Sequence, residues 1–215
     1  MPILNYKEIG SGKALFVLHG LFGSLDNWQT FGKLLSESHR VILVDLRNHG
    51  RSFHSEEMNF EVMSGDLLEL SKQLNIQSFD LLGHSLGGKM AMHFALRHPD
   101  KVEKLIIVDV APFNYVPHHR DVFDALFSVD LETATSRNEI EITIGRQIQD
   151  PMVIQFLMKG IQRDDDGKFK WKFNLATLYK EYSNLIGFVP EGRFDGETLF
   201  IRGENQIISP QKKWA

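Results

Sequence analysis

One segment limits the possible folds of this chain more than any other: a continuous apolar run that passes through Gly-x-Ser-x-Gly directly into a helical pattern. The run is Phe79–Leu82, and the pentapeptide is Gly83–Gly87. The pentapeptide alone is a weak signal. Between a buried strand and a helix, however, it is typical of a sharp turn that lifts a serine hydroxyl above a parallel sheet. The segment therefore predicts an α/β fold in which Ser85 is a nucleophile.

The first half of the chain repeats this alternation of strand and helix. Continuous apolar runs indicate strands that are buried on both faces, and helical patterns lie between them. The runs are 14–18, 41–44, 79–82 and 105–108. Alternating strands and helices predict a mostly parallel sheet with helices on both faces.

The pattern changes at Pro112. Residues 112–190 carry helical patterns, an acidic turn at 164–167 and no clear buried strand, and a strand pattern returns at 198–201. A helical insertion between two strands of one sheet is typical of a lid or cap. We therefore expect a core in residues 1–111, a helical cap in 112–190 and a return to the core in 191–215.

Composition excludes several kinds of partner and site. With 215 residues, 42% hydrophobic residues and a net charge of −4, the chain has no basic surplus for nucleic acid. Cysteine is absent, which excludes disulfides, thiolate zinc sites and a cysteine nucleophile. Neither a secretory signal nor an apolar run long enough for a membrane span is visible. We expect a cytoplasmic protein whose partner is a small molecule.

A glycine-bearing turn after the run 14–18 predicts a second part of the same site. The turn reads His19-Gly20-Leu21-Phe22-Gly23. In this position a loop supplies one backbone N–H to an oxyanion, and the residue after the nucleophile supplies another. We expect the N–H groups of Leu21 and Leu86 to be these two donors. A plain strand-to-helix turn is the alternative.

A phosphate-binding loop is a rival interpretation of the serine turn. Gly83–Lys89 also spells Gly-x-x-x-x-Gly-Lys, the first part of that motif. The motif continues with Ser or Thr, whose hydroxyl holds magnesium. Here the next residue is Met90, whose thioether does not bind that ion, so the rival is disfavoured.

Four motifs in sequence order carry a resemblance to a known family. They are His19-Gly20-x-Phe22-Gly23, Asp45-x-Arg47-x-x-Gly50-x-Ser52, Gly83-His84-Ser85-Leu86-Gly87-Gly88 and Val108-Asp109-x-Ala111-Pro112. The chain resembles α/β-hydrolases of the bacterial YbfF esterase type and their animal relatives, from its first residues to about Ser209. The resemblance implies an α/β-hydrolase fold and a Ser–carboxylate–His hydrolase of carboxylic esters or acyl thioesters, acyl-CoA among them. It also implies no metal and no organic cofactor.

Two carboxylates are candidates for the acid that orients the histidine. Asp109 ends the strand run 105–108, and Glu204 follows the run 198–201. Most α/β-hydrolases place an aspartate after the later strand, where this chain has Glu204 instead. The YbfF type resembles proteins with the acid one strand earlier, so the resemblance favours Asp109. Glu204 stays the alternative.

The histidine itself has no clear candidate. All nine histidines lie between His19 and His119, and none follows the last predicted strand. His118 and His119, at the start of the cap, would approach Ser85 only through an unusual fold of the lid. The chain ends 13 residues after Arg202, whereas a final helix, strand and histidine loop need roughly 35–45 residues. We therefore expect that the C-terminal helix and strand are missing, and that activity is weak at most.

Two functions follow as hypotheses. The first is a serine hydrolase in which Ser85 forms an acyl-enzyme, Asp109 orients a histidine, and Leu21 and Leu86 bind the oxyanion. The second is a catalytically silent binding protein of the same fold, favoured by the missing histidine and disfavoured by the intact serine turn. The sequence does not specify acyl length, leaving group or oligomeric state.

Overall fold

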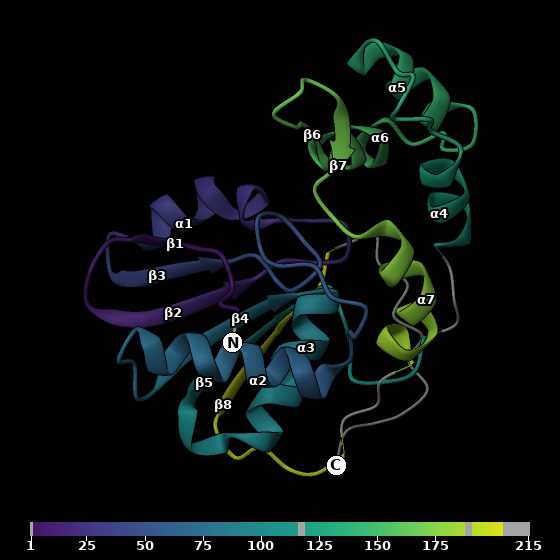
Figure 1. Cartoon of the computed structure of the whole chain (residues 1–215). Helices are drawn as coiled ribbons and strands as arrows, with labels where there is room; N and C mark the ends of the chain where they lie inside the picture. The colour runs from purple at the N-terminus through teal and green to yellow at the C-terminus, as the bar shows by residue number, and fades with distance from the viewer. Residues whose placement is uncertain (1, 116–118, 188–190, 204–215) are drawn as a thin grey trace.

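The computed structural model describes residues 2–115, 119–187 and 191–203. Within these residues, six strands form one sheet in the order β1-β3-β2-β4-β5-β8 (Figure 1). β1 is antiparallel to β3, and the other neighbouring pairs are parallel. The strands are β1 (Tyr6–Ile9), β2 (Lys13–Leu18), β3 (His39–Val44), β4 (Phe79–His84), β5 (Val102–Val108) and β8 (Glu197–Ile201). The predicted mostly parallel sheet is confirmed.

Helices cover both faces of the sheet, as predicted. A 3₁₀ turn (Leu25–Trp28) and α1 (Gln29–Leu35) pack on one face, and α2 (Phe60–Gln73) and α3 (Leu86–Arg97) pack on the other (Figure 1). The buried apolar residues form two hydrophobic clusters. Leu15 and Val17 of β2 belong to the smaller cluster, and Phe16 and Leu18 belong to the larger one. Burial on both faces explains why the strands read as continuous apolar runs.

A second unit lies beyond the carboxyl ends of the parallel strands (Figure 1). We call its described residues, 119–187, the cap. Its elements are α4 (Arg120–Phe127), α5 (Arg137–Gly145), α6 (Pro151–Lys159), β6 (Ile161–Arg163), β7 (Phe169–Trp171) and α7 (Leu175–Ile186). The helical patterns seen in the sequence at 122–127 and 152–158 are therefore helices.

The cap is not all-helical, so that expectation is wrong in one place. β6 and β7 form an antiparallel hairpin. The acidic segment between them supplies its turn: Asp164 Oδ1 accepts from the N–H groups of Asp166 and Lys168, and Gly167 has φ 79°. Three-residue strands are too short to give a periodic pattern, which is why the sequence did not reveal them.

β8 occupies an edge of the sheet among the described residues. The strand predicted at 198–201 is confirmed, but all five residues of β8 are exposed, with Leu199 at 55% and Phe200 at 51%. Of the helices that the structure describes, none has the length and apolar character needed to cross a membrane.

Candidate active site

Ser85 lies at the turn between β4 and α3 with a strained backbone. Its φ is 51° and its ψ is −116°, a region that residues with a side chain rarely occupy. Its N–H donates to the Val108 carbonyl at 3.0 Å, and its carbonyl accepts from Lys89 N–H at 3.0 Å. These bonds to β5 and α3 hold the strained residue in place. The predicted strand–turn–helix arrangement around Ser85 is confirmed.

Close backbone contacts explain two glycines of the pentapeptide. A Cβ on Gly83 would collide with the carbonyl of Gly87, and a Cβ on Gly87 would lie 2.5 Å from the carbonyl oxygen of His19. Neither contact is possible for a real side chain. The loop after β2 therefore passes directly beside the serine turn.

Ser85 lines a cavity of about 130 Å³ between the core and the cap. The core contributes Leu21, Leu86, Lys89, Asp109 and Val110, and the remaining wall consists of Tyr115, His119, Tyr182, Leu185 and Ile186. All four residues predicted for the site, Ser85, Asp109, Leu21 and Leu86, thus line one cavity.

The two expected oxyanion donors have backbone N–H groups available for a ligand. Leu86 is the first residue of α3, so its N–H lies at the positive end of the helix dipole and has no partner within the helix. In the described part of the chain, neither this N–H nor that of Leu21 has a hydrogen-bond acceptor. Both groups can therefore donate to a bound oxygen.

Asp109 is held between β5 and the end of β8. It follows β5 directly with φ 53°, and its N–H donates to the Ile201 carbonyl at 2.9 Å. Its Oδ1 accepts from the N–H of Gly203 at 2.5 Å. Glu204, the alternative acid, lies outside the described residues. Asp109 therefore has a strained backbone, and its carboxylate is held at the cavity wall, where it is suited to orient a histidine.

His84 precedes Ser85 in the chain and His19 lies in the loop beside it, but His19 is not arranged as a base. His19 is buried, its Nδ1 donates to the Gly20 carbonyl at 2.8 Å, and its Nε2 accepts from Leu46 N–H at 3.0 Å. Burial lowers the pKa of His19 to about 4, so the ring is neutral and fully hydrogen-bonded. Burial also lowers the pKa of His84, and nearby Asp109 partly opposes that shift.

His119 reaches the Ser85 cavity, which the sequence suggested only as an unusual arrangement. Its backbone N–H donates to the Tyr182 hydroxyl at 3.2 Å, and its Nδ1 lies 2.6 Å from that oxygen. His118 lies outside the described residues. Over residues 2–115, 119–187 and 191–203, no histidine hydrogen-bonds with Ser85 or Asp109.

The loop after β3 supports the architecture and does not line the Ser85 cavity. The buried carboxylate of Asp45 accepts from Leu25 N–H at 2.7 Å and from Arg51 N–H at 3.0 Å. Arg47 forms an ion pair with Asp66 at 2.6 Å. These contacts fix the loop on the sheet, as expected of a supporting element.

Sequence reasoning missed Lys89 as part of the site. Its side chain lines the Ser85 cavity although the residue is only 3% exposed. Burial lowers the pKa of Lys89 to about 8. The available signal was a single charge inside the otherwise apolar start of a helix, 86–92. In the disfavoured phosphate-loop interpretation, Lys89 is the lysine of the Gly-x-x-x-x-Gly-Lys motif.

Comparisons with known proteins agree with this geometry. A family model described as alpha/beta hydrolase fold matches residues 13–169. Esterase YbfF of Escherichia coli K12 is 34% identical over 192 residues, which are 89% of this chain and 74% of that protein. The sn-1-specific diacylglycerol lipase ABHD11 of Danio rerio is 33% identical over 206 residues, covering 91% of this chain. The chain spans 64% of that relative's length.

A solved structure carries the same fold and a related sequence. The marine microorganism esterase has a TM-score of 0.92 and 39% identity, with 95% of this chain and 82% of that chain covered. The resemblance based on the four motifs is thereby confirmed. The chain belongs to the α/β-hydrolase fold family.

Proposed function

We propose that this protein hydrolyses carboxylic esters through an acyl-enzyme on Ser85. The observation that carries the proposal is the strained serine turn, which shares one cavity with Leu21, Leu86 and Asp109. The names of the relatives, an esterase and a diacylglycerol lipase, support an ester as the substrate.

The proposed reaction has two steps. In the first, Ser85 Oγ bonds to the acyl carbon and its proton passes to a base, while the carbonyl oxygen becomes an oxyanion that Leu21 and Leu86 N–H groups stabilise. Collapse breaks the bond to the leaving group, which takes the proton from the base. In the second step, water attacks the acyl-enzyme and releases the acid and Ser85.

Asp109 would orient and stabilise the imidazolium of a histidine base. No described residue is assigned as that base. His119 Nδ1 lies 2.6 Å from the Tyr182 hydroxyl, and in the described part of the chain its ring makes no hydrogen bond with Ser85.

The cavity favours an apolar acyl group, because Leu21, Leu86, Val110, Leu185 and Ile186 form much of its wall. Acyl thioesters, acyl-CoA among them, are the second proposed substrate class, since the same acyl-enzyme forms from a thiolate leaving group.

The test compares p-nitrophenyl esters with acyl-CoA thioesters of matched acyl chains, using the wild type and Ser85→Ala. Without the Ser85 hydroxyl no acyl-enzyme can form, so Ser85→Ala should retain only background hydrolysis. Hydrolysis within tenfold of wild type in Ser85→Ala would contradict the proposal. Binding of a fatty acid with no turnover in either protein would instead support the silent binding protein.

A further inference from the structure

Lys89 is a buried cation one helical turn after Ser85, and the proposed reaction does not use it. The residue is 3% exposed on α3. Its Nζ donates to the carbonyl of Phe113 at 3.1 Å and to the carbonyl of Ile186. Because a buried ammonium is costly without such partners, these bonds determine where the side chain lies.

The two carbonyls belong to the two chain segments that join the cap to the core. Phe113 lies on the segment that leaves β5 for α4, and Ile186 is the last residue of α7. The carbonyls at a helix C-terminus lack partners within the helix and carry its negative dipole end. An ammonium at Ile186 is therefore favourable, and one side chain on α3 contacts both connections.

Tyr115 brings the two connections together around the same ammonium. Its N–H donates to the Ile186 carbonyl at 3.4 Å, and its hydroxyl accepts from Ala111 N–H at 2.8 Å. Its ring centre lies 4.8 Å from Lys89 Nζ, within the range of a cation–π contact. The lysine thus lies inside a compact joint between the core and the cap.

We propose that Lys89 is a positioning residue that holds the cap over Ser85 by hydrogen bonding both cap connections at once. With its pKa at about 8, the side chain is mostly protonated at neutral pH, which strengthens both bonds. The proposal rests on the proposed function only where acylation of Ser85 is the readout.

Other contacts between the cap and the core lie away from this joint. Lys172, after β7, forms an ion pair with Asp26 at 3.0 Å, and Asn174 N–H donates to the Asn48 carbonyl at 2.9 Å. These contacts do not involve Lys89. Removing the lysine should therefore loosen the two connections without unfolding the core.

The first experiment is hydrogen exchange on the full chain with Lys89→Met, which keeps an apolar stem of similar length and removes the ammonium. Lys180→Met is the matched control: it changes an exposed lysine on α7, the helix whose last carbonyl Lys89 contacts. Amides in 113–115 and 183–187 should exchange about tenfold faster or more in Lys89→Met, with the amides of β2–β4 little changed. The control should match the wild type.

The second experiment restores the ammonium and separates its role from that of the stem. Because the sequence contains no cysteine, Lys89→Cys can be alkylated selectively in the unfolded chain with 2-bromoethylamine and then refolded. The product carries an ammonium at the same number of bonds from Cβ as lysine. Alkylation with 1-bromopropane gives the uncharged counterpart. The aminoethyl form should restore slow exchange in both segments, and the propyl form should not.

Acylation kinetics give a readout that a merely structural role would not change. With an activated ester, Lys89→Met should raise the concentration for half-maximal acylation several-fold and change the maximal rate by less than about twofold, because the cap binds substrate but donates no oxyanion contact. If wild-type Ser85 does not acylate, the proposed function fails while hydrogen exchange still tests the joint. Unchanged exchange in both segments, a uniform rise across the core, or equal rescue by the propyl form would each overturn the role of Lys89.

Discussion

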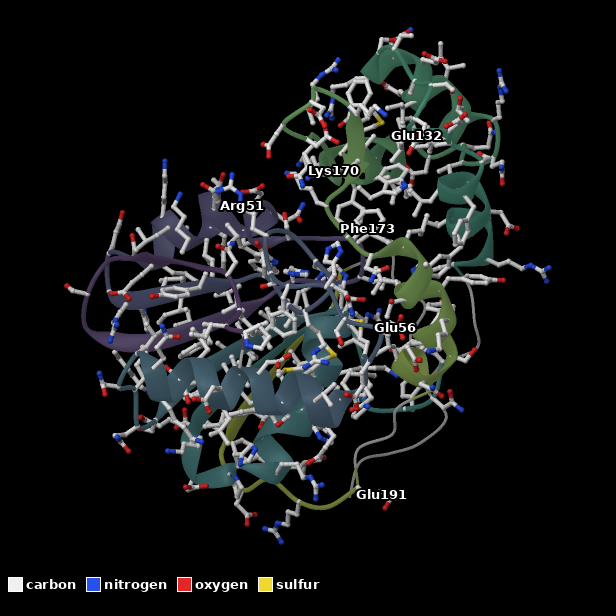
Figure 2. All side chains as sticks on the ribbon, viewed as in Figure 1. Arg51, Glu56, Glu132, Lys170, Phe173 and Glu191 are labelled. Carbon is white, nitrogen blue, oxygen red and sulfur yellow. The ribbon has the colours of Figure 1, made fainter. Side chains whose placement is uncertain are left out.

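The ring of Phe22 lies 5.3 Å from the ring of Phe173, so the loop expected to bind the oxyanion contacts the cap directly. Phe22 also meets Phe123 of α4 at 5.1 Å, edge to face, and it has a φ of 61°. Figure 2 labels Phe173 on the segment between β7 and α7, where the cap approaches the core. Two cap aromatics therefore fix a strained residue beside Leu21.

Phe173→Leu should slow acylation of Ser85 by about tenfold. Complete loss of an oxyanion donor lowers kcat by about 10²–10³, and this change only loosens the loop that carries the Leu21 donor. It should also lower the free energy of unfolding by about 1–3 kcal/mol through the lost ring contacts with Phe22 and Trp171. Urea unfolding and acylation rates measure the two effects. Phe127→Leu, at a 50% exposed ring on α4, is the control. If acylation is slowed equally in both variants, the contact between Phe173 and Phe22 does not affect the oxyanion loop.

Asp109→Asn should reduce acylation far more than Glu204→Gln. Only a carboxylate fixed at the cavity wall can set the histidine tautomer, and loss of that role costs on the order of 10⁴ in rate. The two variants are compared in a form of the protein in which Ser85 hydrolyses an ester. If Glu204→Gln is the more damaging change, the acid is Glu204.

Stability should fall as the pH is lowered from about 6.5. Burial lowers the pKa of His19 to about 4 and that of His49 to about 3, the latter also through repulsion from His19. Between these values and about 6.5 the unfolded chain binds protons that the folded chain does not, so the free energy of unfolding decreases as the pH falls. Each group contributes up to about 1.4 kcal/mol per pH unit in that window.

Urea unfolding between pH 6.5 and 5 tests this dependence. His49→Gln should make the slope shallower, and it is a mild change because Nε2 of His49 has no hydrogen-bond partner among the residues that the structure describes. His39→Gln, at a partly exposed ring in β3, serves as the matched control. An identical slope in wild type and His49→Gln would mean that His49 is not buried in its neutral form.

His119→Gln should leave the rate of Ser85 acylation within about threefold of wild type. His119 Nδ1 lies 2.6 Å from the Tyr182 hydroxyl, and in the described part of the chain the ring makes no hydrogen bond with Ser85, whereas a general base must reach the proton it takes. Acylation of the wild type and the variant by one activated ester measures this. A loss of about 10²–10⁴, the usual contribution of a general base, would instead assign His119 as the base.

The sheet and the serine turn were predictable because their signals are local. Strands buried on both faces read as continuous apolar runs, and Gly83 and Gly87 mark contacts that only glycine allows. Pro99 also marks the end of α3, which stops at Arg97. In each case a short stretch of sequence determines its own conformation.

The contacts of the cap were not predictable, because they join residues far apart in the chain. The lysine of α3 meets carbonyls of Phe113 and Ile186, and no pattern in the sequence pairs these positions. The buried face of α1 likewise depends on tertiary packing, as Phe31 and Leu34 show. Both side chains are exposed, because Gly32 of α1 packs against the sheet at Leu43.

A fluorophosphonate probe reacts with an activated serine, so labelling with this probe measures whether Ser85 is a nucleophile. The wild-type chain and Ser85→Ala are incubated with the probe, intact mass counts the adducts, and peptide mapping locates them. We expect a single adduct on Ser85 that is absent from Ser85→Ala and that forms more slowly when an ester substrate is added. An adduct on another residue, or equal labelling of Ser85→Ala, would contradict it, as would a folded wild type that stays unlabelled.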